Sequence, residues 1–166
     1  NLMQISEITN ESLIKIIKKS NSYSIDGFYI ADSLGSLYAH QVTTIVHTLK
    51  KYSKVKIGIH AHNNKLMALA NSLQAVSCGV EYVDSTIKGM GRGCGNAQTE
   101  YLYIEKNKLN KKKCFSDPVK NLSVLINREF NELNLKYKWN DNLYYYLSGE
   151  YKIHPSYVQE ILKNNN

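Results

Sequence analysis

The chain has 166 residues, 43% of them apolar, which is long enough to bury one hydrophobic core. Its formal charge of +7 would suit a nucleic-acid partner, but the basic residues are spread along the chain. The one dense run, Lys106 to Lys113, is mixed with asparagine. We therefore expect this run to be a solvated loop, and we expect no nucleic-acid interface. The three cysteines lack CxxC spacing, so we expect no disulfide framework. The sequence shows no charged-then-apolar leader and no apolar run near the ~20 residues of a membrane helix. These features predict a cytoplasmic protein without membrane contact.

In chain order, four short apolar stretches predict β-strands, and each is followed by a segment with helical spacing. The strands are expected at Asn1 to Ile5, Gly27 to Ala31, Val55 to Ile59 and Val80 to Asp84. Thr9 is expected to cap the first helix, and Gly79 is expected to end the third. This alternation of strands and helices predicts a parallel sheet with right-handed crossovers.

The polar residues that end the four expected strands are regularly spaced. Gln4, Asp32, His60 and Asp84 are 28, 28 and 24 residues apart, close to the length of one βα unit of a parallel barrel. An open doubly wound sheet would have the same pattern, but polar groups at all four strand ends favour the barrel, because an open sheet binds its ligand at one switch point. Since a barrel of this kind has eight strands, we predict an α/β fold that is the C-terminal half of a TIM (β/α)8 barrel, and we expect the N-terminal half to lie upstream of Asn1.

The pattern changes after Tyr101. The expected divisions are residues 1–104 as the barrel half, 105–118 as a linker and 119–166 as a small helical C-terminal extension. Helices of the extension are predicted over Val119 to Leu135 and over the tyrosine-rich stretch Asn142 to Leu162, with an interruption near His154 and Pro155.

The motif His60-Ala61-His62-Asn63 stands at a predicted strand end, directly before a helix. Residues two apart in a strand project to the same face, so both imidazoles can reach one ion, and neutral imidazole is a common metal ligand. An isolated pair of this kind often only forms local hydrogen bonds, which is the alternative interpretation. We expect His60 and His62 to be metal ligands.

A glycine-rich run, Lys88 to Ala97, follows the last predicted strand. Its glycines let the backbone approach a ligand closely, and Asn96 has an amide oxygen that could coordinate an ion at the expected helix start. A flexible turn with Asn96 as a helix N-cap is the alternative.

Two carboxylates and a tyrosine cluster complete the candidates. Asp32 and Asp84 each end a strand, where a carboxylate can position a base, orient a histidine ligand or support a metal, although Asp-Ser is also a common turn dipeptide. Tyr144 and its two tyrosine neighbours could supply a proton donor, and aromatic packing explains them equally well. Cys94 is interpreted as an inert small side chain.

Five segments of the chain, taken together, resemble the HMG-CoA lyase-like, or DRE-TIM, metallolyases, and among them the 4-hydroxy-2-oxovalerate aldolase group. The matching segments are residues 1–4, 29–35, 58–63, 83–86 and 89–97, in the order and spacing of that family. The likeness covers residues 1 to about 100, and its most specific feature is an HxHN motif followed by a glycine-rich loop that ends in Gly-Asn.

The resemblance implies that His60 and His62 bind a divalent ion, usually Mn²⁺ or Mg²⁺, and that Asn96 completes or borders the site. It implies a lyase that cleaves a 4-hydroxy-2-oxo acid to pyruvate and an aldehyde through a metal-stabilised enolate. In this family an aspartate ligand and an arginine come from the first strand, so we expect both upstream of Asn1 and expect this chain alone to be inactive. Tyr144 is the nearest match to the family's C-terminal tyrosine, and no family role transfers to Cys94.

The same resemblance implies partners and leaves alternatives. A small 2-oxo acid is the expected substrate, an acylating aldehyde dehydrogenase is an implied partner, and the full-length protein is expected to be a homo-oligomer. A condensing synthase of the isopropylmalate or citramalate type shares the two histidines and the loop. A noncatalytic remnant or binding module that keeps half of the fold is the third possibility.

Overall fold

The structure is a computed structural model that describes residues 1–112 and 117–164. At its centre lies a parallel sheet with the strand order β1 (Gly27–Asp32), β2 (Lys56–Ala61) and β3 (Tyr82–Val83). At the carboxyl end of the sheet, Asp32 pairs with Ala61, and Ile59 pairs with Val83. Consecutive strands are therefore neighbours and parallel, as the spacing of the polar strand ends predicts.

The first expected strand, Asn1 to Ile5, is reduced to one bridge. Leu2 pairs in parallel with Ile30 and hydrogen-bonds to the β1 backbone on both sides, at 2.7 and 2.9 Å. Gln4 then adopts a left-handed backbone conformation, with a φ of 51°, and a 3-10 turn over Ile5–Glu7 follows. Because this turn ends the extended segment, the prediction of a full strand is wrong, although the segment lies beside β1 as expected.

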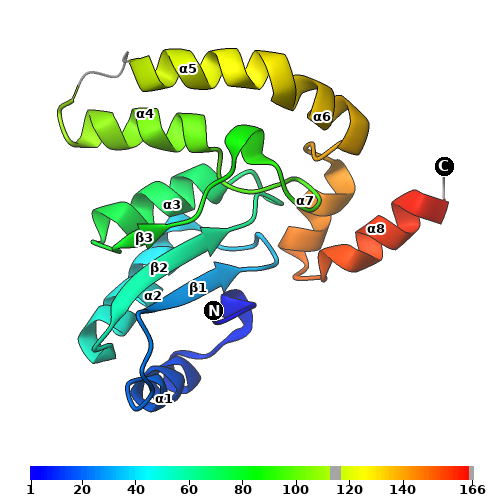
Figure 1. Cartoon of the computed structure of the whole chain (residues 1–166). Helices are drawn as coiled ribbons and strands as arrows, with labels where there is room; N and C mark the ends of the chain where they lie inside the picture. The colour runs from blue at the N-terminus through cyan, green and yellow to red at the C-terminus, as the bar shows by residue number, and fades with distance from the viewer. Residues whose placement is uncertain (113–116, 165–166) are drawn as a thin grey trace.

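Apolar side chains of the strands and helices form one core. The helices of this half are α1 (Asn10–Ser20), α2 (Ala39–Tyr52), α3 (Ala68–Ser77) and α4 (Thr99–Leu109). The side chain of Thr9 accepts a hydrogen bond from the Ser12 amide, which confirms the predicted cap of α1. Figure 1 shows α2 and α3 behind the strands, and their buried residues Val46 and Ala75 pack in one cluster with Ile30 and Ile59 of the sheet.

The strands alternate between two faces, and this alternation separates the core from the polar face. Ile30 and Ile59 point to the helix-covered face and are almost completely buried. Tyr29, Gly58 and His60 belong to the alternate positions of the same ladder, so they share the other face. Gly58 is required there, because a Cβ at this position would lie 2.5 Å from the Tyr29 ring.

The C-terminal extension is helical, as predicted. Its elements are α5 (Asp117–Leu125), the π-helical segment η3 (Ile126–Phe130), α6 (Asn131–Tyr137), α7 (Leu143–Glu150) and α8 (Pro155–Asn164). The expected interruption near His154 falls between α7 and α8. The expected limit of the barrel half at residue 104 falls inside α4, and residues 113–116 of the expected linker, including Cys114, lie outside the described residues.

The extension covers the carboxyl end of the sheet, where Figure 1 places α7 next to the tips of β1 and β2. Polar contacts hold it there. The buried Lys65 ammonium donates hydrogen bonds to the Glu150 carboxylate and to the Tyr38 hydroxyl, and the Asn64 amide donates to Ser148 Oγ at 3.3 Å. The loop that follows β2 is therefore joined directly to α7, and Lys65 links it to Tyr38, at the end of the loop that follows β1.

No helix within residues 1–112 and 117–164 combines the length and the apolar character needed to cross a membrane.

Candidate functional site

The two histidines of the motif lie side by side at the carboxyl end of β2. His60 belongs to the strand and His62 follows it directly. Their ring centroids are 5.0 Å apart, and the rings meet edge to face at 80°. The imidazoles therefore share one side of the chain, as period-two spacing predicts, and their binding of a common ion stays a prediction.

A carboxylate from the neighbouring strand orients His60. The Nδ1 atom of His60 lies 3.1 Å from Oδ2 of Asp84, which follows β3 directly. A proton on Nδ1 would be donated to this carboxylate, which leaves Nε2 as the unprotonated nitrogen that can bind an ion. Histidine ligands of protein metal sites commonly have such a carboxylate partner, so Asp84 occupies the supporting position that the sequence suggests.

The imidazole of His62 is largely buried and kept neutral. Burial, with contributions from the positive charge of Arg92 and from His60, lowers the pKa of His62 to about 4. Its Nδ1 atom is buried and has no hydrogen-bond partner among the described residues. A neutral imidazole with an unpaired buried nitrogen is an available ligand, whereas an unpaired buried polar atom otherwise costs stability.

The glycine-rich loop brings Asn96 beside His62. The two residues form an isolated antiparallel bridge, and the Asn63 amide donates to the Gly95 carbonyl at 2.9 Å. Gly95 has a φ of 81°, and a Cβ at this residue would lie 2.0 Å from the Gly89 carbonyl oxygen. Only glycine fits at this position, so the glycine spacing of the loop has a direct structural cause.

The side chain of Asn96 is turned so that its oxygen is unpaired. Its Nδ2 atom donates to the Met90 carbonyl at 3.2 Å, while Oδ1 is buried and has no hydrogen-bond partner in the part of the chain that the structure describes. The helix α4 begins at Thr99 with Gln98 at its N-cap position. Asn96 is therefore not the N-cap that the alternative interpretation suggests.

These residues fit a divalent cation. Two imidazoles and one amide oxygen are donors that Mn²⁺ and related ions accept, and within the described residues a buried nitrogen of His62 and the buried oxygen of Asn96 are both unpaired. Among residues 1–112 and 117–164, no group of three His, Cys, Asp or Glu side chains is arranged to hold an ion. The binding of an ion by His60, His62 and Asn96, and the further ligand expected upstream of Asn1, stay predictions.

The side chain of Asp32 points away from the histidine pair, although its carbonyl accepts a hydrogen bond from the His62 amide at 3.4 Å. Asp32 pairs with Ala61 in the ladder, so its side chain points to the helix-covered face, and it is 1% exposed. Its carboxylate oxygens accept hydrogen bonds from the Ser36 and Leu37 amides, at 3.0 and 3.1 Å. Burial raises the pKa of this carboxyl, and the backbone hydrogen bonds oppose the increase. A catalytic part for Asp32 stays a prediction, and the structure gives it contacts within its own loop.

The tyrosine cluster divides between solvent and interior. Tyr144 lies in the first turn of α7 and is 53% exposed. Its neighbour Tyr145 is buried against the glycine-rich loop, where its ring would lie 2.9 Å from a Cβ on Gly93. Cys94 of the same loop is buried, and burial raises the pKa of its thiol. The role of Tyr144 as a proton donor remains a prediction.

Two residues near the histidine pair have no role in the sequence-based hypothesis. The guanidinium of Arg92 donates through Nη2 to the Ser33 carbonyl at 2.8 Å, and its Nη1 lies 3.3 Å from Nε2 of His154. A charged residue among four glycines could have drawn attention to Arg92. Nothing in the local pattern around His154 indicates that it reaches a loop 62 residues earlier in the chain.

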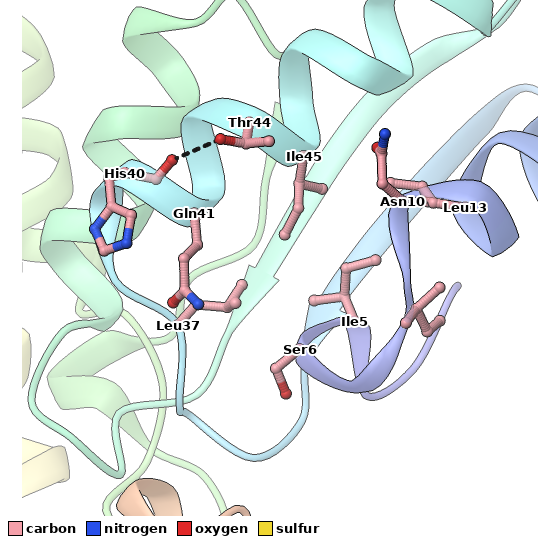
Figure 2. Close-up of a pocket in the computed structure, with 10 residues that line it drawn as sticks. Ile5, Ser6, Asn10, Leu13, Leu37, His40, Gln41, Thr44 and Ile45 are labelled. Carbon is pink, nitrogen blue, oxygen red and sulfur yellow. Dashed lines mark hydrogen bonds between the residues drawn. The ribbon is translucent and has the colours of Figure 1, made fainter.

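A separate hollow lies between the N-terminal 3-10 turn, α1 and the start of α2. Figure 2 shows Ile5, Leu13 and Ile45 along its walls, with polar side chains such as Gln41 and His40 at one side. Its lining includes none of the residues of the histidine site. This hollow is therefore distinct from the site at the strand ends.

Comparison with known proteins agrees with the family resemblance of the sequence. A model of the family described as HMGL-like matches residues 1–121. The 4-hydroxy-2-oxovalerate aldolase of Carboxydothermus hydrogenoformans is 39% identical over 108 residues, which are 65% of this chain and 32% of that protein. The aldolase of the same name from Geobacillus genomosp. 3 is 42% identical over 101 residues, 61% of this chain and 30% of that protein. The chain spans about a third of the length of these curated relatives.

Solved structures are similar over different shares of the chain. The N-terminal domain of a putative aldolase from Bacteroides vulgatus covers 96% of this chain with a TM-score of 0.81 and 31% identity, and the match uses 52% of that domain. The HMG-CoA lyase of Bacillus subtilis covers 64% of this chain, and 38% of that enzyme, with a TM-score of 0.56 and 25% identity. The α/β fold class, part of a TIM barrel with a parallel sheet, is confirmed, and the first match includes the helical extension.

Proposed function

Because this chain belongs to the HMGL-like family, we propose that it is the C-terminal half of a divalent-metal-dependent aldolase that cleaves a 4-hydroxy-2-oxo acid to pyruvate and an aldehyde. The single observation that carries the proposal is the pair of imidazoles of His60 and His62, 5.0 Å apart, beside the unpaired buried oxygen of Asn96. The names of the curated relatives support the substrate class.

Each residue of the site has a proposed part. His60, His62 and Asn96 would hold Mn²⁺ or Mg²⁺, and Asp84 would keep His60 in the tautomer that leaves Nε2 free. A bound divalent ion would supply a Lewis acid that stabilises the negative charge gained by the keto oxygen as the C–C bond breaks. Asp32 would act as a positioning residue, since its carboxylate organises the loop that follows β1.

The proposed enzyme needs a second half. Leu2 and β3 are the outer members of the described sheet, so the sheet has two open edges. A complementary half barrel would pair with both edges and cover the face that carries Tyr29 and His60. We propose that this half also supplies the remaining metal ligand and a positive charge at the substrate carbonyl. Homo-oligomerisation and partnership with an acylating aldehyde dehydrogenase are further proposals that rest on the family resemblance.

The experiment compares the 166-residue chain with the full-length reading frame. Pyruvate release from racemic 4-hydroxy-2-oxovalerate is measured with Mn²⁺ and with a chelator. We expect metal-dependent activity from the full-length protein and none from the chain alone. In the full-length protein, His60→Ala and His62→Ala should each abolish activity, whereas His47→Ala, at an exposed position on α2, serves as the matched control.

Several outcomes would contradict the proposal. Strong activity of the isolated chain would show that the missing half is dispensable. Full activity of both histidine variants would remove the metal site from the reaction. Condensation of an acyl-CoA with a 2-oxo acid, in place of cleavage, would assign the protein to the synthase alternative. Tyr144→Phe and the control Tyr146→Phe, assayed in parallel, test the proton-donor role, which predicts a loss of activity only in the former.

A further inference from the structure

Within residues 1–112 and 117–164, a half-buried arginine stands near His62 without an ion-pair partner. Arg92 lies in the glycine-rich loop, and its guanidinium is close enough to His62 for its charge to contribute to the lowered pKa of that imidazole. One of its nitrogens donates to the Ser33 carbonyl at 2.8 Å. This contact places the guanidinium beside the loop that follows β1, within electrostatic reach of His62.

The two carboxylates at the strand ends, Asp84 and Asp32, are bound to groups other than Arg92. Among the described residues, the ion pairs of the chain do not include Arg92. Asp84 is bonded to His60, and Asp32 is buried with its oxygens on backbone amides. Burial lowers the pKa of Arg92, which shows that its charge is partly removed from water. An arginine in this condition is electrostatically incomplete, and a bound anion would complete it.

His154 of the extension faces the same guanidinium. Its Nε2 lies 3.3 Å from Nη1 of Arg92, and its Nδ1 lies 2.8 Å from Ser156 Oγ and 3.3 Å from the Ser156 amide. When Nδ1 accepts from the amide, a neutral ring carries its proton on Nε2. Two donors then face each other, which is the arrangement that an anion placed between or beside them would satisfy. In the other tautomer, Nε2 accepts from Arg92 and holds the guanidinium in place.

We propose that Arg92 and His154 bind an anionic group of the substrate beside the His60–His62 pair. This inference rests on the proposed function and deepens it by naming the recognition of charge at that site. The planar guanidinium can bind a carboxylate through two parallel hydrogen bonds, and its two observed contacts leave further N–H donors free. The anionic group is either the carboxylate next to the keto group or a second one at the far end of the substrate.

The site would join the two regions of the chain. Arg92 comes from the barrel half and His154 from the turn between α7 and α8. A purely structural alternative makes the same pair a support that fastens the extension to the loop. The two interpretations differ in a measurable way, because a support contributes to stability and an anion site contributes to the affinity for anions.

The experiment uses the full-length protein and the variants Arg92→Gln, Arg92→Lys and His154→Gln. Arg128→Gln is the control, since Arg128 is exposed and belongs to the extension. Calorimetric titration with oxalate in the presence of Mn²⁺, and with inorganic phosphate in its absence, measures anion binding directly. We expect Arg92→Gln to weaken binding about ten- to hundredfold, as for loss of hydrogen bonds to a charged group, and His154→Gln to weaken it less. Arg92→Lys should retain part of the affinity, because lysine keeps the positive charge but lacks the planar pair of N–H donors of the guanidinium.

Steady-state kinetics identify which anionic group is bound. If Arg92 binds the carboxylate next to the keto group, Arg92→Gln should raise KM equally for 4-hydroxy-2-oxovalerate and for 4-hydroxy-2-oxoglutarate. If it binds a second group, KM should rise only for the dicarboxylate. Either result supports the inference.

Unchanged anion binding and unchanged KM in Arg92→Gln would overturn the inference, and so would a loss of thermal stability in all three variants with no change in anion affinity. The same measurements distinguish failure of the anion site from failure of the proposed aldolase function. If the unaltered protein cleaves neither substrate yet binds phosphate in an Arg92-dependent way, the anion site stands without the aldolase assignment. If cleavage occurs and Arg92→Gln changes nothing, only the anion site is lost.

Discussion

The barrel half and the C-terminal extension are stabilised in different ways. All 15 buried residues of the main apolar cluster lie between Ile5 and Ala97, in the barrel half. The second cluster has three buried residues, Cys94, Tyr145 and Val158, and one of them belongs to the glycine-rich loop. Within the described residues, the extension therefore has little core of its own, although Trp139 is also buried. Polar contacts to the strand-end loops and the packing of Tyr145 against the glycine-rich loop position it, so its place over the site depends on hydrogen bonds and ion pairs as well as on this small apolar contact.

The largest expected effect tests the core of the barrel half. Ile59→Ala, at a residue 1% exposed, should lower the free energy of unfolding by about 2–5 kcal/mol, because it removes buried methyl groups and leaves a cavity. Val158→Ala in the extension should cost about 1–2 kcal/mol. Urea denaturation followed by circular dichroism measures both. Equal losses would contradict the difference drawn between the two regions.

The second prediction concerns pH at the place where the two regions meet. The pKa of His62 falls to about 4 in the folded state, against 6.5 in its ordinary state. The unfolded chain therefore binds more protons between these values, and stability rises with pH across this window. In the metal-free protein we expect a loss of about 3 kcal/mol as pH falls from 6.5 to 4, at about 1.4 kcal/mol per pH unit.

Urea denaturation at a series of pH values measures this loss. His62→Gln should flatten the profile across the window, while His47→Ala should leave it unchanged. A profile of His62→Gln with the same slope as the original protein would show that another group causes the dependence.

The third prediction separates the extension from the barrel half. A Cβ on Gly149 would lie 2.8 Å from Cγ of Lys65 and 3.1 Å from the Gly35 carbonyl oxygen, so Gly149→Val should push α7 off the strand-end loops. We expect limited proteolysis to cut the extension several times faster, with a small change in the unfolding midpoint of the barrel half. Leu143→Val, at an exposed position of the same helix, is the control. Cooperative unfolding of the whole chain in Gly149→Val would show that the two regions form one unit.

The smallest expected effect belongs to a surface contact between the regions. Lys152 Nζ lies 3.0 Å from Oε1 of Glu7, and both side chains are about half exposed. Exposed ion pairs contribute about 0–1 kcal/mol and are screened by salt. Lys152→Ala should therefore change stability by less than about 1 kcal/mol, and the change should shrink at high salt in urea denaturation. A larger loss that does not depend on salt would give Lys152 a structural role beyond this pair.

Patterns of neighbouring residues in the sequence predict the strands and helices whose formation depends on those same neighbours. Apolar period-two stretches and helical spacing indicate the strands β1 and β2 and the helices behind them, because the residues that bury these faces are neighbours in sequence. The strand Asn1 to Ile5 fails, since the left-handed conformation of Gln4 is a property of one residue that apolar patterning does not record. The Gln4 amide donates a hydrogen bond to Ser33 Oγ, which joins two residues that are 29 positions apart in the sequence.

In the candidate site, too, some features follow from local sequence and others depend on contacts between distant segments. The shared face of His60 and His62 follows from their spacing alone. The orientation of Asp32 depends on register, because its pairing with Ala61 and not with His60 puts its side chain on the core face. The meeting of Arg92 with His154 depends on how the extension folds back, and that is set by contacts between segments far apart in the chain. Residue type and spacing thus indicate the candidate ligands and the possible support of a histidine by Asp84, and they miss Arg92 and His154.

The bridge between His62 and Asn96 has an entropic consequence for the proposed metal binding. Backbone hydrogen bonds from Asn63 to Gly95, at 2.9 Å, and from Ala97 to Ala61, at 3.3 Å, tie together the two segments that carry the proposed ligands, before any ion would bind. Ligands that are already immobilised lose less conformational freedom on binding, so more of the interaction free energy remains as affinity. Lengthening the glycine-rich loop by one residue would break this register, and the resulting gain in loop freedom should weaken metal affinity even with every ligand retained.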